Sequence, residues 1–189
     1  MADVYAPAAP DRKPPRLTID SAAGSIHRVA QARLLIVWHS RTGASEAMAR
    51  AAAEGAGQGG RLLPCEAAAA DDLLGADGFL FCTPENLAAL SGAMKDMFDR
   101  LYYPLLGHVE GRAYASVIAA GSDGTGAQRQ LDRIATGWRL RRVAEPMIVN
   151  FHAQTPDAIL ANKAVPLDTL ARCREMGAVL AEGLELGLF

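Results

Sequence analysis

Cysteine is scarce in this chain. The three cysteines, Cys65, Cys82 and Cys173, lie far apart in the sequence, and no Cys-x-x-Cys pair occurs. Because their number is odd and their spacing wide, they argue against a disulfide framework and against a zinc site. We therefore expect no metal ligands, and we expect a reducing compartment, the cytoplasm.

Charge of one sign and long apolar runs are also missing. The 189 residues include 19 Lys and Arg against 21 Asp and Glu, which gives a formal net charge of −2. No basic stripe offers an electrostatic surface to nucleic acid. No apolar run approaches the roughly 18 residues that a membrane-spanning helix needs. We expect neither nucleic acid nor a membrane among the partners.

The N-terminal part of the chain lacks the central apolar block of a secretory signal. It contains four prolines, at positions 7, 10, 14 and 15, with charged residues between them. This composition is typical of a poorly ordered segment. We expect residues 1–30 to form a flexible arm and residues 31–189 to form one domain.

Strand and helix signals alternate along the rest of the chain. Short apolar runs predict five strands, at Arg33–Trp38, Arg61–Cys65, Gly78–Cys82, Ala113–Ala120 and Val143–Val149. Helical periodicity predicts helices at Ala44–Gly57, Asp71–Leu74, Leu90–Pro104, Ala127–Trp138 and Leu167–Leu184. The fold class is therefore α/β, a doubly wound, five-stranded parallel sheet in three α/β/α layers, with strand order 2-1-3-4-5. Pro64 assigns the second strand to an edge, and Thr155-Pro156 predicts one helical turn within Asn150–Pro166.

A hydroxyl-rich turn connects the first strand to the first helix. After the apolar run ends, Ser40, Thr42, Gly43 and Ser45 surround the predicted helix N-terminus. Free backbone N–H groups and the helix dipole make such an end a binding site for phosphate. The turn has no Lys and no Gly-x-Gly-x-x-Gly, so a phosphate monoester suits it better than a nucleoside triphosphate or a dinucleotide. The alternative is an ordinary helix cap and turn.

Two further loops have unusual chemistry, and both follow central strands. One runs from Thr83 through Glu85 and Asn86 to Lys95, and the other is the glycine-rich turn Gly121–Gly126. Ligands of open parallel sheets bind outside the carboxyl ends of the strands, where these loops and the first turn meet. The three loops together are more specific than any one of them.

With these loops the sequence resembles the flavodoxin-like superfamily, in its NAD(P)H-dependent FMN reductase and quinone reductase branch. Residues 40–45 match the flavodoxin phosphate loop, [Ser/Thr]-x-Thr-Gly-x-[Ser/Thr], and residues 76–100 match the reductase branch. The turn at 121–126 lies where the family has its third flavin loop. The resemblance covers about residues 34–149 and, more loosely, the last helix.

The resemblance implies an FMN site built from three groups of residues. The phosphate would be held by Ser40, Arg41, Thr42, Gly43, Ala44 and Ser45. Backbone groups would line the isoalloxazine ring at Thr83, Pro84, Glu85, Asn86 and Leu87. The other edge of the ring would meet Gly121, Ser122, Asp123 and Gly124. No catalytic side chain is implied, because the electron chemistry belongs to the cofactor.

The function implied is electron transfer from NAD(P)H through FMN to a quinone-like or other flat acceptor. No aromatic residue lies between Thr83 and Lys95, where electron-carrier flavodoxins stack one on the ring, so an open ring face leaves room for nicotinamide. The alternatives are a flavodoxin-type carrier without a nicotinamide site, and a flavin-free structural module.

The third helix carries more apolar residues than one core-facing stripe can bury, which favours a homodimer. Tyr102, Tyr103 or Trp138 would supply the missing stacking group, and in a dimer Tyr102 or Tyr103 would lie near the partner's flavin. The alternative interpretations are that these aromatics pack on their own helix face, and that Asn150–Pro166 covers the surplus within one chain.

Overall fold

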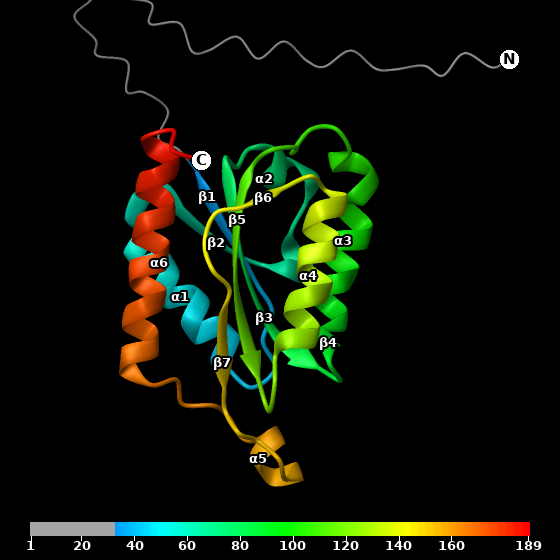
Figure 1. Cartoon of the computed structure of the whole chain (residues 1–189), viewed down its shortest axis with the longest axis vertical. Helices are drawn as coiled ribbons and strands as arrows, with labels where there is room; N and C mark the ends of the chain where they lie inside the picture. Colours follow the sequence, from blue (N-terminus) through cyan, green and yellow to red (C-terminus); the bar gives the residue numbers. More distant parts are fainter. Residues whose placement is uncertain (1–32) are drawn as a thin grey trace, which may run out of the picture.

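Strand β1 (Leu34–Trp38) lies inside a parallel sheet with helices on both faces (Figure 1). The computed structural model describes residues 33–189, so the expected arm at 1–30 lies outside the described residues. The other strands are β2 (Gly60–Pro64), β3 (Gly78–Asn86), β4 (Ala89–Leu90), β5 (Ala113–Ala120), β6 (Arg141–Arg142) and β7 (Met147–Asn150). The helices are α1 (Ala44–Ala56), α2 (Ala70–Leu74), α3 (Gly92–Leu105), α4 (Thr125–Gly137), α5 (Pro156–Leu160) and α6 (Leu167–Glu185).

The strand order confirms the doubly wound fold. The sheet runs β2-β1-β3-β5, and β5 then pairs in parallel with both β6 and β7. β2 with its Pro64 is at the edge, as the missing N–H of proline requires. Helices α1 and α6 cover one face of the sheet, and α3 and α4 cover the other (Figure 1).

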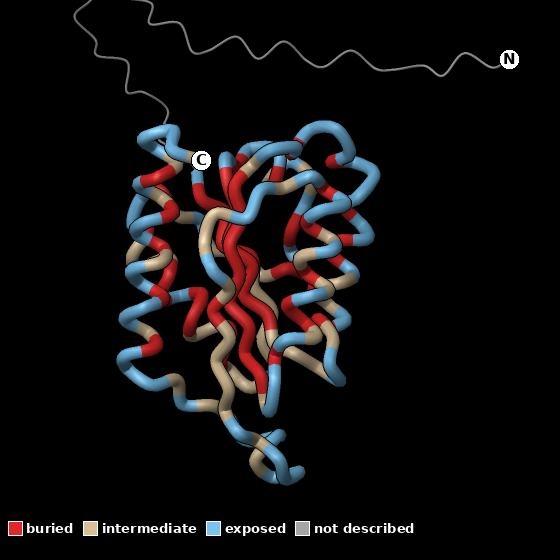
Figure 2. The backbone as a smooth tube through the Cα atoms, viewed as in Figure 1, coloured by how far each residue is buried: buried red, intermediate tan, exposed pale blue. Residues whose placement is uncertain are grey.

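Alternate residues of the central strands fill two separate cores. Leu35, Val37 and Phe81 belong to the core under α3 and α4, whereas Ile36 and Leu80 belong to the core under α1 and α6. Because both faces are covered, β1 and β5 are buried along almost their whole length (Figure 2). This explains their continuous apolar runs, since a strand with one wet face would alternate.

The strand expected at Val143–Val149 is wrong over its first half. Only residues 147–149 of that range are strand, in β7; residues 143–146 are not, and a separate short strand, β6, precedes them. Tyr114 of β5 pairs with Arg142 and Val117 pairs with Met147, so four residues face the two residues Ala115 and Ser116. The surplus loops out as in a β-bulge, and Pro146, which has no N–H, lies within it.

The third strand is longer than expected. It continues past Cys82 to Asn86 and turns back into β4, with Glu85 opposite Leu90 and Asn86 opposite Ala89. The two turn residues, Leu87 and Ala88, have φ of 51° and 58°. Turn signals normally come from Gly or Asn at such positions, and their absence hid this hairpin in the sequence.

Two glycines bring α1 and α6 into backbone contact. A Cβ on Gly177 of α6 would overlap the carbonyl of Ala52 in α1, and a Cβ on Gly55 of α1 would overlap the carbonyl of Arg174. Small residues at both positions therefore set the distance between the helices. Within residues 33–189, no helix is long and apolar enough to cross a membrane.

The cysteines are buried and free, and burial is the largest cause that raises each pKa. The pKa of Cys65 rises to about 12 and that of Cys173 to about 11. Neutral thiols of this kind are poor nucleophiles and poor metal ligands. In the described part of the chain, no cluster of three or more His, Cys, Asp or Glu residues could hold a metal ion.

Candidate functional site

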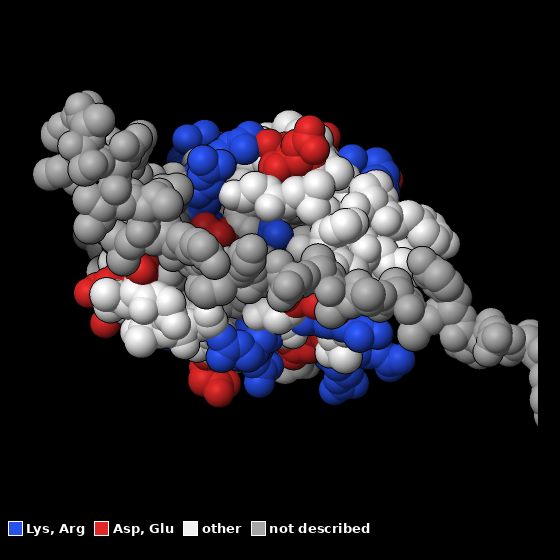
Figure 3. Space-filling view, turned by 90° about the horizontal axis from the view of Figure 1, so that it is seen from above, with Lys and Arg blue, Asp and Glu red and all other residues white. Residues whose placement is uncertain are grey.

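The three loops singled out in the sequence meet at one end of the sheet. β1, β3 and β5 are neighbours and run in parallel, so the turns that follow them share the edge formed by the carboxyl ends of the strands. Helix α5 lies beyond the same edge (Figure 1). Figure 3 looks onto the opposite end of the molecule, where acidic and basic residues are interspersed on the visible surface.

The first loop forms an open cradle at the start of α1. Gly43 is the N-cap of α1 with φ of 85°, and a Cβ added there would meet no atom within 4 Å. No side chain caps this helix end. The Ser45 side chain is only 1% exposed, and its hydroxyl has no hydrogen-bond partner among the described residues.

An unpartnered hydroxyl inside the first turn of a helix is costly, because a buried polar group without a hydrogen bond loses its contact with water. A phosphate oxygen at the helix N-terminus would give the Ser45 hydroxyl a partner, and it would also meet the positive end of the helix dipole. The cradle therefore fits a phosphate group. Arg41 is exposed beside it, and Thr42 is half-buried.

His39 connects β1 to this loop. Its backbone N–H donates to the carbonyl of Cys82 at 3.0 Å, which extends the pairing of β1 with β3. The imidazole Nε2 is 3.6 Å from the carboxylate of Glu66, and Nδ1 is buried without a partner among the described residues. Burial lowers the His39 pKa and Arg41 acts in the same direction, whereas Glu66 opposes them. The lowered pKa favours a neutral imidazole beside the cradle.

The second loop is the β3–β4 hairpin rather than an irregular segment. Thr83 is buried and its hydroxyl lies 3.1 Å from that of Ser91, the N-cap of α3, so its side chain supports the fold. The expected contact of its backbone with a ring stays a prediction. Pro84 and Asn86 are half-buried, and Leu87 at the tip is fully exposed.

Glu85 has a role that the sequence did not predict. Its carboxylate accepts the N–H groups of Gly124 and Ala127, at 2.7 and 3.2 Å, and so caps the N-terminus of α4. We expected Glu85 to act through its backbone alone. The side chain instead ties the second loop to the third, and Gly126 packs against the carbonyl of Ala88 with no room for a Cβ.

The third loop, Gly121–Gly124, is held from within the chain. The Asp123 carboxylate accepts the hydroxyl of Thr125, and the carbonyl of Ser122 accepts the side-chain amide of Asn150. Gly124 has φ of 89°, and a Cβ there would overlap Ile148. A glycine is therefore needed at position 124 for packing and backbone conformation, and its close approach to a ring stays a prediction.

The segment that connects β7 to α6 reaches the site. Residues 150–163, which we call the strap, leave β7 beside the third loop and end beside the first. The N–H of Ala153 donates to the carbonyl of Gly121, and the N–H of Lys163 donates to the carbonyl of Thr42, each at 2.8 Å. The helical turn predicted at Thr155-Pro156 is confirmed as α5, with Thr155 as N-cap.

The aromatic residues considered as stacking groups lie elsewhere. Trp138 is buried in the core, edge-to-face with Phe98 at 5.1 Å between ring centroids. Tyr102 and Tyr103 belong to the second half of α3, away from the carboxyl ends of the strands. Within one chain, the described residues place no aromatic side chain on the three loops.

The comparisons with known proteins agree with this geometry. Residues 64–154 match the family model "NADPH-dependent FMN reductase". A flavodoxin of Aquifex aeolicus is 28% identical over 159 residues, which is 79% of this chain and 85% of the relative.

Solved structures share the fold at low identity. A WrbA-like flavodoxin from Agrobacterium tumefaciens has a TM-score of 0.67 and 20% identity, and the match covers 82% of this chain and 98% of the other. A flavodoxin from the domain Archaea has a TM-score of 0.65 and 15% identity, with 80% and 98% covered. The chain thus has the flavodoxin-like fold, and its residues 64–154 are similar to the NADPH-dependent FMN reductase family.

Proposed function

We propose that this protein is an FMN-dependent oxidoreductase that takes electrons from NAD(P)H and delivers them to a quinone-like or other flat acceptor. The observation that carries the proposal is the buried, unpartnered Ser45 hydroxyl in an uncapped first turn of α1. The family match over residues 64–154 supports FMN as the owner of the phosphate.

Each part of the site has its own task in this proposal. The cradle at residues 40–45 binds the phosphate, and the backbone of the β3–β4 hairpin and of Gly121–Gly124 orients the ring. FMN, when bound, supplies the capacity to accept two electrons and to pass them on. The residues themselves position the cofactor and exclude water, so no acid or base side chain is required.

The hairpin supports the choice of a reductase over a simple carrier. Asn86 and Leu87 stand where an aromatic residue would cover the ring, and Leu87 is fully exposed. An aromatic stack would contribute roughly 0.5–1.5 kcal/mol beyond area burial. Without it the ring face stays accessible to a nicotinamide or a flat acceptor.

A flavodoxin-type electron carrier is the second candidate. The relative from Aquifex aeolicus, which bears the name flavodoxin, favours it. A carrier exchanges electrons with protein partners and needs no nicotinamide site. The two candidates therefore differ in their reaction with NADH or NADPH.

Rapid mixing with a reduced nicotinamide separates the two functions. We expect the FMN-loaded chain to lose its flavin absorbance when it is mixed anaerobically with NADH or NADPH in a stopped-flow instrument. Addition of a quinone should restore the absorbance. A loaded chain that stays oxidised with both nucleotides contradicts the reductase and supports the carrier, whereas a chain that binds no FMN contradicts both.

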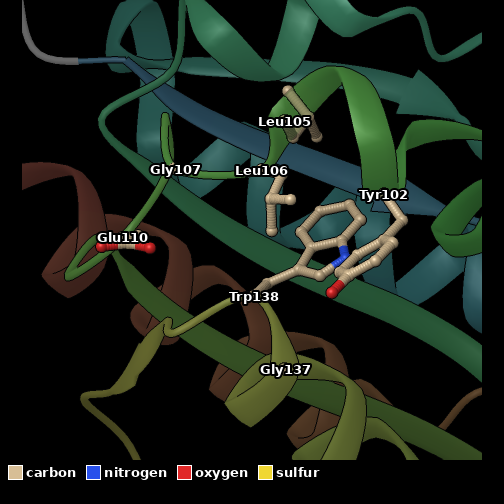
Figure 4. Close-up of a pocket in the computed structure, with 7 residues that line it drawn as sticks. All are labelled: Tyr102, Leu105, Leu106, Gly107, Glu110, Gly137 and Trp138. Atoms are coloured by element: carbon tan, nitrogen blue, oxygen red, sulfur yellow. The ribbon is translucent and has the colours of Figure 1, made fainter. Parts of the chain in front are cut away.

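The homodimer is a proposal that rests on the outer face of α3. Tyr103 is 79% exposed and Leu106 is 55% exposed. Next to them, Tyr102 and Trp138 line a small hollow (Figure 4). The strap does not cover this face, because it is hydrogen-bonded at the carboxyl ends of the strands. A second copy of the chain would bury the apolar surplus, and the partner's Tyr102 or Tyr103 would then approach a ring.

Light scattering tests the dimer. We expect a mass twice the 20.0 kDa of one chain, and we expect Tyr103→Lys to reduce it to that of one chain because a charge would be buried in the interface. Val179→Lys is the control, since Val179 on α6 is also a mostly exposed apolar residue, at 55%, but lies on another face. A wild-type mass of one chain contradicts the proposal.

A further inference from the structure

The strap is hydrogen-bonded to both loops that flank the site. At its start, Ala153 N–H and Gln154 Nε2 both donate to the carbonyl of Gly121, at 2.8 and 3.2 Å. At its end, Lys163 N–H donates to the carbonyl of Thr42. The second attachment falls within the phosphate cradle, one residue before Gly43.

Helix α5, between these attachments, has little stability of its own. It comprises five residues, none of them buried, and Ile159 and Leu160 are mostly exposed. A helix of this length is unstable in isolation, because nucleation costs more than one turn of hydrogen bonds returns. A contact in addition to its own backbone hydrogen bonds must therefore stabilise α5.

Lys163 stabilises α5 with its side chain. The ammonium Nζ donates to the carbonyls of Ala158, Ile159 and Ala161, at 2.7, 3.1 and 2.5 Å. These three bonds use every N–H of the ammonium and satisfy carbonyls at the C-terminal end of α5. The side chain of Lys163 thus caps the C-terminal end of α5, while its backbone N–H donates to the carbonyl of Thr42.

We propose that Lys163 is a positioning residue for the phosphate cradle: by closing α5 and bonding Thr42, it holds residues 40–45 in the shape that receives the FMN phosphate. The inference rests on the proposed FMN site and deepens it. Lys163 acts through the loop and does not reach the phosphate, because its ammonium is fully occupied by carbonyls.

The test compares FMN with riboflavin, which has the same ring but no phosphate. Lys163→Met keeps the backbone N–H and removes the ammonium. We expect the Kd of FMN to rise about tenfold and that of riboflavin to stay unchanged, because the strap acts on the phosphate cradle alone. Lys163→Arg, which restores a cationic donor to the carbonyls, should recover most of the FMN affinity.

The matched control is Lys95→Met. Lys95 also uses its ammonium within the chain, on Asp99 at 2.6 Å, but on α3 rather than on the strap. It should leave both Kd values unchanged. The inference is overturned if Lys163→Met binds FMN with the Kd of the wild type, or if the substitution raises the Kd of FMN and the Kd of riboflavin by the same factor.

Hydrogen exchange keeps this test separate from the proposed function. In the full-length, flavin-free chain, Lys163→Met should speed amide exchange in residues 40–45 and at position 163, whereas Lys95→Met should not. If Lys163→Met leaves amide exchange in residues 40–45 unchanged, the proposed role of Lys163 is overturned. A wild-type chain that binds no FMN contradicts the proposed function, and the exchange experiment still decides whether Lys163 holds the cradle.

Discussion

Replacing Ser45 by alanine is expected to weaken FMN binding about 10- to 100-fold, because a hydrogen bond to a charged phosphate contributes roughly 1.5–3 kcal/mol. The same change should stabilise the flavin-free protein by about 1 kcal/mol, because it removes a buried hydroxyl that has no partner. The two effects have opposite signs. A residue that only supported the fold would not produce that combination, so it marks a ligand contact.

Titration with FMN and thermal unfolding of the flavin-free protein measure the two quantities. Ser116→Ala is the matched control: Ser116 is equally buried, but its hydroxyl donates to Gln128 at 2.8 Å. Loss of this hydrogen bond in Ser116→Ala should lower the stability of the flavin-free protein and leave the FMN affinity unchanged. If Ser45→Ala binds FMN as tightly as the wild type, the phosphate does not lie in this cradle.

The second large effect is expected at the contact between α1 and α6. Gly177→Ala should lower the free energy of unfolding by about 3 kcal/mol, at the upper end of the usual cost of overpacking. The added methyl would overlap the backbone carbonyl of Ala52, which cannot rotate away as a side chain could. The helices would have to separate, and the core beneath them would loosen.

Urea or guanidinium unfolding, followed by circular dichroism, checks this value. Gly137→Ala on α4 is the control, because a Cβ there meets no atom within 4 Å. In a helix, alanine is favoured over glycine by up to about 1 kcal/mol, so this variant should be unchanged or slightly more stable. Equal stability of Gly177→Ala and the wild type would contradict the close packing of α1 on α6.

Much of the fold was predictable from local patterns. Apolar runs located β1, β2 and β5, Pro64 assigned β2 to an edge, and Thr155-Pro156 located the start of α5. Alternation of strands and helices then fixed the parallel order, because crossovers between parallel strands follow few topologies. The meeting of three loops at one end of the sheet follows from that order.

Local patterns failed where a distant contact decides the conformation. The β3–β4 hairpin turns through Leu87 and Ala88, whose positive φ values no propensity favours, and contacts with α4 hold it. The break between β6 and β7 depends on pairing with β5. Both α4 and β5 are distant in sequence from the segments that they hold, so neither the hairpin nor the break could be predicted from the local residues.

The sequence by itself determined the sheet, its order and the three loops that form the candidate site. Only the tertiary structure decided that the Ser45 hydroxyl is left without a partner, that Glu85 caps α4, and that Lys163 bonds Thr42. The physical reason is the range of the interactions: periodicity and turn chemistry act over a few residues, whereas a hydrogen-bond partner 39 or more positions away is set by how the layers pack.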